Sequence, residues 1–107
     1  MDEEGWVKMW RVSLKSSVWQ NANTWMVWSW CLMKATHETY KFPFNGEDVE
    51  IIPGQFVTGI KKAIKEVPIS AQTYRTAITY LKSTGRTTIK TTNKFSLITV
   101  INWAKYQ

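Results

Sequence analysis

The sequence predicts one domain of the α+β class. Four segments carry apolar residues at the spacing of an α-helix, and others are short runs of β-branched and aromatic residues beside turn residues. The chain has 107 residues, of which 44% are hydrophobic and 14% aromatic. It is therefore long enough for one hydrophobic core, and its composition is the opposite of that of a disordered protein. We expect a single domain over residues 1–107.

The first 35 residues predict two helices. Between residues 5 and 15 apolar side chains recur at helical spacing, which predicts a first amphipathic helix. These side chains are Trp6, Met9, Trp10 and Leu14. Asn21 or Asn23 can cap a second helix that runs to about residue 35. This helix is apolar on nearly all sides, so we expect it to be buried on more than one side, with Cys31 as a buried, unreactive thiol.

Residues 42–52 predict a β-hairpin. Phe42 and Phe44 alternate with other residues before the Asn-Gly pair at 45–46, and branched aliphatic residues follow this pair. Residues 55–57 predict one more short strand. The chain therefore changes from helical to β-type patterning after the second predicted helix.

Two further helices are predicted in the second half. Thr58 can cap a helix over residues 59–67, and Pro68 ends it because proline has no amide hydrogen and disfavours helical geometry in the preceding residue. Ser70 can cap the next helix, over residues 71–83.

The helix at 71–83 is amphipathic and is followed by a second hairpin. Its apolar residues fall at positions i, i+3, i+4 and i+7, which marks a face that packs into the core. They are Tyr74, Ala77, Ile78 and Leu81. Gly85 can adopt the left-handed conformation that ends a helix. The runs 87–91 and 95–101 are rich in β-branched residues and predict the two strands of the hairpin.

The charge is divided unevenly along the chain. Residues 1–50 hold five basic and seven acidic side chains, for a net charge of −2, whereas residues 51–107 hold nine basic side chains and only Glu66 as an acid, for +8. The whole positive excess of +6 therefore lies in the second half. An anionic partner should be sought there.

Several classes of function are disfavoured by what the sequence lacks. With one Cys and one His there is no disulfide and no Cys/His cluster at zinc-ligand spacing. We find no phosphate-cradling glycine loop and no catalytic Ser/His/Asp spacing. The acidic N-terminus is unlike a signal peptide, and the longest apolar stretch, at 25–33, is too short to span a membrane. We therefore expect a cytoplasmic protein that is not an enzyme and has no cofactor, metal or membrane partner.

Residues 58–101 are predicted in the order helix, tight turn, helix and hairpin, which is the order of a winged helix-turn-helix. Residues 1–57 would then be an N-terminal extension of helices and a hairpin. The helix at 71–83 would be the one that enters the major groove of DNA, because its outward side is polar or basic and carries no acid. The predicted DNA-binding residues of the motif are Lys61, Lys62, Ser70, Gln72, Thr73, Arg75, Thr76, Thr79, Lys82, Arg86, Lys90, Asn93 and Lys94.

Six of the seven tryptophans lie in the first half, at helical spacing. Aromatic residues beside basic ones can stack with single-stranded nucleic acid, but this placement favours a core or a subunit interface. We predict that Trp10, Trp28 and Trp30 form a homo-oligomer interface. The alternative to DNA binding is a protein-interaction or oligomerisation module, such as a phage regulator or inhibitor, that uses its winged helix and tryptophan-rich surface to bind a protein.

The chain also resembles a known family along nearly its whole length. The most specific segment is TTNKFSLITVINWAKYQ at residues 91–107, and SAQTYRTA at 70–77 and PGQFVT at 53–58 also match. Shorter matches are GWVKM at 5–9, SVW at 17–19, LMKATH at 32–37 and FNGE at 44–47, together with Leu81 and Gly85. These residues resemble the N-terminal winged-helix domain of replication-initiation proteins of phages and Gram-positive bacteria, the replisome organisers with DnaD-like architecture.

The resemblance implies sequence-specific binding of double-stranded DNA, often at a replication origin of a phage or plasmid in a bacterial host cell. It also implies self-association through the N-terminal helices and hairpin. In such proteins this domain is usually followed by a linker and a C-terminal domain that engages the helicase-loading machinery. Replication proteins are therefore expected partners of a longer chain.

Overall fold

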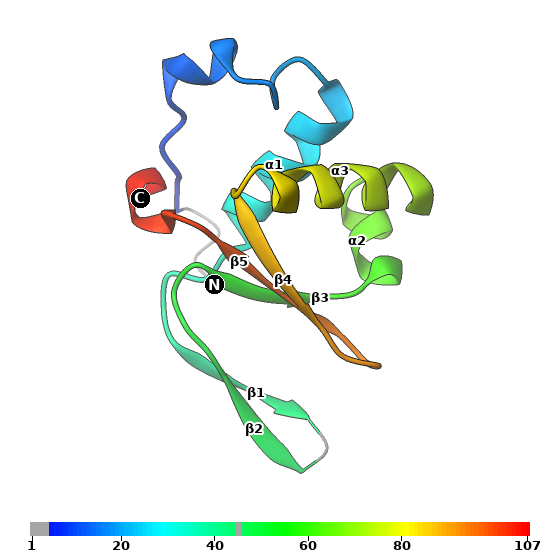
Figure 1. The fold of residues 1–107 in the computed structure, drawn as a ribbon. Coiled ribbons are helices and arrows are strands. Elements are labelled where there is room, and N and C mark those ends of the chain that lie inside the picture. Colours follow the sequence, from blue (N-terminus) through cyan, green and yellow to red (C-terminus); the bar gives the residue numbers. More distant parts are fainter. Residues whose placement is uncertain (1–4, 45) are drawn as a thin grey trace.

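The structure, a computed structural model, describes residues 5–44 and 46–107 and is a small mixed α+β domain. The described residues form three α-helices and two antiparallel sheets (Figure 1). The elements are α1 (Ala22–Lys34), β1 (Tyr40–Phe44), β2 (Glu47–Ile51), β3 (Gln55–Thr58), α2 (Ile60–Glu66), α3 (Ala71–Ser83), β4 (Thr87–Thr91) and β5 (Ser96–Val100). Short 3₁₀ helices at Arg11–Lys15 and Trp103–Tyr106 flank them. The α+β class predicted from the sequence is confirmed.

The three-stranded sheet has the order β3-β5-β4, so the last strand of the chain is its centre. Ile98 on β5 pairs with Phe56 on one side and with Ile89 on the other, and the Ile98 side chain is fully buried. The three helices lie on one side of this sheet, and the β1–β2 hairpin extends on the other (Figure 1). Because β3 pairs with β5 along its length, the predicted extension 1–57 and the segment 58–101 share one sheet.

Helix α1 crosses the centre of the core. Asn21 is its N-cap, since the Asn21 side chain accepts a hydrogen bond from the Thr24 amide at 3.1 Å. The prediction that this helix is buried on more than one side is confirmed. Cys31 is fully buried, and this burial raises the pKa of its thiol, which disfavours the reactive thiolate.

Two of the three tryptophans predicted at an oligomer interface lie in the core instead. Trp30 packs edge-on against Phe56 and Tyr74, at 5.2 and 6.0 Å between ring centroids, and Trp28 packs against Tyr106 at 5.6 Å. Both tryptophan side chains are buried within the chain itself. The prediction was therefore wrong for Trp28 and Trp30, because one chain already covers both sides of α1. Trp10 remains half exposed, and its role in an interface remains a prediction.

The helix predicted at residues 5–15 does not form. Residues 5–10 are irregular, and only Arg11–Lys15 forms a short 3₁₀ helix. The reason is that a short helix is marginal unless its apolar face is packed, and here Trp6, Met9 and Leu14 stay exposed. The backbone bonds instead to the end of the chain, where the Lys8 amide donates to the Tyr106 carbonyl at 2.7 Å.

The β1–β2 hairpin is confirmed, with Phe42 opposite Val49. Of its predicted Asn-Gly turn, Asn45 lies outside the described residues, whereas Gly46 has a φ of +76°. Phe42 and Phe44 both pack against Phe95, at 5.4 and 4.8 Å between ring centroids. The hairpin is thereby held against the β4–β5 turn.

Helix α3 has the bounds predicted for it, because both of its ends carry strong signals. Ser70 accepts a hydrogen bond from the Thr73 amide at 3.1 Å at the N-terminus. At the other end Gly85 has a φ of +76°, and its amide donates to the Lys82 carbonyl at 3.1 Å. The left-handed region is costly for residues with a Cβ, so glycine suits this position.

Replacing Ser70 by alanine should lower the free energy of unfolding by about 1 kcal/mol, because one amide of the first turn loses its acceptor. Urea denaturation of both proteins measures this loss. Ser70→Asp is the control, since a carboxylate can accept the same bond and should restore most of the stability. Equal losses for the two variants would show that the cap bond is not the source.

Candidate nucleic-acid interface

The outward side of α3 is polar and basic. Tyr74, Ala77, Ile78 and Leu81 are buried, as their spacing predicts. The opposite side exposes Gln72, Arg75, Thr76, Thr79 and Lys82. The helix has no acidic residue, so nothing on it opposes an approaching anion.

The side chains of α3 differ in how far they are engaged within the protein. Ser70 is occupied by its cap bond and also donates to Thr73 Oγ1 at 2.9 Å, and Thr76 donates to the Gln72 carbonyl at 3.0 Å. Tyr80, at the edge of this side, donates to Ser17 Oγ. Within the part of the chain that the structure describes, Arg75 and Lys82 form no ion pair. These two cations are therefore available to an external group.

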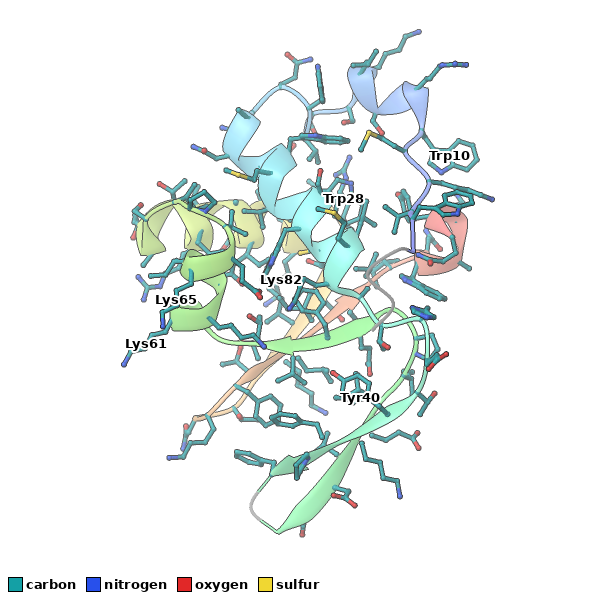
Figure 2. All side chains as sticks on the ribbon, turned by 180° about the vertical axis from the view of Figure 1, so that it is seen from behind. Trp10, Trp28, Tyr40, Lys61, Lys65 and Lys82 are labelled. Atoms are coloured by element: carbon teal, nitrogen blue, oxygen red, sulfur yellow. The ribbon has the colours of Figure 1, made fainter. Side chains whose placement is uncertain are left out.

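Helix α2 adds three exposed lysines beside α3. Ala63 of this helix is fully buried, while Lys61, Lys62 and Lys65 are exposed. Figure 2 shows Lys61 and Lys65 on the outer side of α2, at the opposite side of the molecule from Trp10. The basic side of α2 thus faces solvent next to α3, against which α2 packs.

The single acid of the second half is neutralised by α1. Glu66 accepts a hydrogen bond from the Trp30 indole at 3.2 Å and forms an ion pair with Lys34 at 3.2 Å. Among residues 5–44 and 46–107, the other ion pair within 4.0 Å joins His37 to Glu38. Among the residues that the structure describes, no basic residue of α2, α3 or the β4–β5 hairpin is therefore paired with a carboxylate.

The β4–β5 hairpin has an ordered turn with basic and polar groups at its tip. Thr92 Oγ1 accepts hydrogen bonds from the amides of Lys94 and Phe95, at 3.2 and 3.1 Å. Phe95 is anchored on the β1–β2 hairpin, whereas Lys90, Asn93 and Lys94 are exposed. In Figure 1 this tip points to the same side of the molecule as α2.

Arg86 is separated from the other predicted residues. It lies immediately before β4, is only partly exposed, and lines a pocket with Trp10 and Tyr106. Sequence reasoning missed Lys15, Lys105 and Tyr106 in this pocket. No local signal could have found it, because the pocket joins residues from both ends of the chain.

No helix among the described residues is both long enough and apolar enough to cross a bilayer. They also contain no group of three or more His, Cys, Asp or Glu side chains that could hold a metal ion.

Comparisons with models of protein families, with curated proteins and with solved structures gave no match.

Proposed function

We propose that this protein binds double-stranded DNA as a winged helix-turn-helix, with α2 and α3 as the helix pair and the β4–β5 hairpin as the wing. The observation that carries the proposal is the acid-free, exposed side of α3 in a half of the chain whose only acid is paired with Lys34. Such a surface attracts the phosphate backbone and leaves polar side chains free to read bases.

Base reading would be the task of α3. A helix of 13 residues is about 20 Å long and has the width that the major groove of B-DNA accepts. Arg75 has the geometry to bond a guanine through two hydrogen bonds, and Gln72 can do the same with an adenine. The methyl groups of Thr76 and Thr79 can contact thymine.

The remaining cations would contact phosphates and set the position of α3. Lys61 and Lys62 on α2, Lys82 at the end of α3, and Lys90 and Lys94 on the wing are all exposed. Contacts of this kind add affinity for any sequence without reading it. Asn93 at the wing tip can donate to the same oxygens.

We further propose that the DNA is a replication origin of a phage or plasmid, which rests on the family resemblance of residues 53–58, 70–77 and 91–107. Self-association belongs to the same proposal. Its support is the exposed apolar N-terminal segment, in which Trp6, Met9 and Val12 are 66–74% exposed.

Two single substitutions test the proposal. Arg75→Ala should relax sequence preference at one base pair by about 1–3 kcal/mol, because a base contact is lost. Lys94→Ala should weaken binding to all duplexes alike and reduce the slope of log K against log salt by about one unit. Selection from a random duplex pool, followed by mobility shifts from about 50 mM salt upwards, measures both effects. If the wild type binds no duplex at low salt, DNA binding is excluded.

The exposed N-terminal segment supports a second candidate, a protein-interaction module that binds no DNA. The two candidates respond differently to salt. Binding through Lys and Arg should give salt-sensitive retention on heparin, whereas an aromatic interface should persist at high salt. Capture of a protein partner at high salt, without any retention on heparin, would favour the second candidate.

A further inference from the structure

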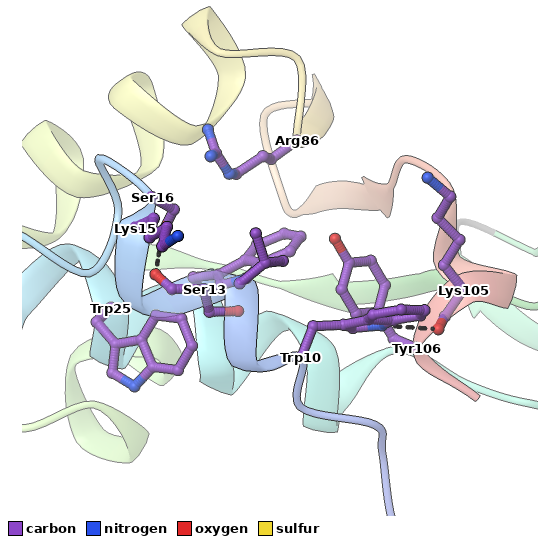
Figure 3. Close-up of a pocket in the computed structure, with 10 residues that line it drawn as sticks. Trp10, Ser13, Lys15, Ser16, Trp25, Arg86, Lys105 and Tyr106 are labelled. Atoms are coloured by element: carbon purple, nitrogen blue, oxygen red, sulfur yellow. Dashed lines mark hydrogen bonds between the residues drawn. The ribbon is translucent and has the colours of Figure 1, made fainter.

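A pocket of about 470 Å³ opens between the N-terminal segment, α1 and the C-terminal 3₁₀ helix (Figure 3). Its aromatic walls are Trp10, Trp25, Trp28 and Tyr106. Three cationic residues, Lys15, Arg86 and Lys105, also line it, and none of its described lining residues is acidic. Its volume is in the range of small-molecule sites.

The pocket is built by contacts between the two ends of the chain. The Trp10 indole donates to the Lys105 carbonyl at 3.1 Å, and the amide of Lys8 donates to the Tyr106 carbonyl at 2.7 Å. Trp28 is buried and meets Tyr106 edge-on, at an interplanar angle of 84°. Trp10 and Tyr106 are therefore held by backbone and ring contacts rather than left as loose surface groups.

The lining specifies the chemistry of a ligand. Aromatic faces bind flat π-systems by stacking, and the attraction is strengthened by nearby cations. Three cations, with no carboxylate among the described lining residues, favour a negatively charged group such as a phosphate. A neutral aromatic compound would leave the cations unused, and an inorganic anion would leave the aromatic walls unused. A base attached to a phosphate uses both.

We propose that this pocket binds a nucleotide, with its base against the aromatic walls and its phosphate attracted by the positive charge of Lys15, Arg86 and Lys105. A free mononucleotide and the end of a phosphorylated single strand share this chemistry. The site does not depend on duplex binding by α3, and Arg86 is the one residue assigned to both surfaces. Occupation would also tie the N-terminal segment to the start of β4.

The test uses dAMP as the probe, with isothermal titration calorimetry for affinity and NMR spectra of the tryptophan indole N–H groups for location. We expect dAMP to shift the Trp10 indole resonance. The double variant Lys15→Gln, Lys105→Gln should bind dAMP roughly tenfold more weakly, because two of the three cations that attract the phosphate are lost. The control is Lys41→Gln, Lys65→Gln, which removes the same charge from exposed positions outside the pocket and should bind like the wild type.

Four results would overturn the proposal. They are no binding of dAMP at about 5 mM, equal affinity for deoxyadenosine, an equal indole shift with inorganic phosphate alone, and equal weakening by the control variant. A 5′-phosphorylated oligo-dA that binds more tightly than dAMP would identify a strand end as the ligand, and equal affinity would identify the free nucleotide. Relaxed sequence preference for duplexes in Arg75→Ala, with unchanged dAMP affinity, would separate this site from the proposed DNA-reading surface.

Discussion

Replacing Trp30 by alanine should lower the free energy of unfolding by about 3–5 kcal/mol, because it leaves a cavity where α1, β3 and α3 pack together. The Trp30 ring meets Phe56 on β3 and Tyr74 on α3 edge-on, and only 7% of its surface is exposed. Its indole also donates to Glu66. Since a domain of this size is stable by about 5–15 kcal/mol, the variant should retain only part of its stability.

Urea denaturation, or the melting temperature by circular dichroism, measures the loss for Trp30→Ala. The melting temperature should fall by about 12–40 °C, at about 4–8 °C per kcal/mol. The matched control is Trp6→Ala, the same substitution at a side chain that is 74% exposed, with an expected change of about 0.5 kcal/mol or less. Trp30→Phe keeps most of the ring packing and loses the bond to Glu66, so its loss should be intermediate.

Equal effects of Trp30→Ala and Trp6→Ala would contradict the core position of Trp30. The stability of these proteins also tests whether Trp30 packs in the core or mediates association between subunits. A tryptophan that mediated association instead of packing in the core would make the stability of the wild type depend on protein concentration, and the variant would abolish that dependence.

The elements that the sequence predicted well are those whose signals are local. Helix α3 combines a Ser70 cap, an apolar stripe and a glycine stop, and its observed bounds agree with the prediction. The strands β4 and β5 have β-branched residues on both sides of a turn with its own hydrogen bonds from Thr92. Each of these signals acts within a few residues, so the sequence contains them directly.

The predictions that were wrong concern which other parts of the chain pack against a helix. Periodicity marked residues 5–15 as amphipathic, but no element that the structure describes covers Trp6, Met9 or Leu14, so the helix is not stabilised. In α1 the pattern was apolar on nearly all sides, and it did not distinguish a second core contact from a subunit interface. Trp28 is covered by Tyr106, a residue far away in sequence, which no local pattern indicates.

One part of the candidate site could likewise be predicted from the sequence, and another part could not. The exposed side of α3 follows from helical spacing, so Gln72, Arg75 and Lys82 could be identified from the sequence. The aromatic pocket could not, because Lys105 meets Trp10 only after the chain ends have come together. Most tryptophans lie in the first half of the sequence and most basic residues in the second half. The fold brings tryptophans and basic residues together in one pocket.

The second large effect should come from removing three proposed phosphate contacts together. The variant Lys61→Gln, Lys62→Gln, Lys94→Gln should bind duplex DNA on the order of 100-fold more weakly at low salt, because these side chains release counterions when they meet phosphates. The slope of log K against log salt should become shallower by about 2.7 units, at about 0.9 per contact. Mobility shifts or fluorescence anisotropy over a series of salt concentrations give both quantities.

A matched variant, Lys8→Gln, Arg11→Gln, Lys41→Gln, separates position from net charge. Both triple variants lower the formal charge from +6 to +3, and all six residues are exposed. If the net charge alone attracted DNA, the two variants would lose affinity equally and their salt slopes would agree. If α2 and the wing contact phosphates, only the first variant loses these contacts, so its affinity falls and its salt slope becomes shallower. The affinity and salt slope of the second variant then stay close to those of the wild type. The difference between the two slopes therefore measures how much of the binding belongs to this surface.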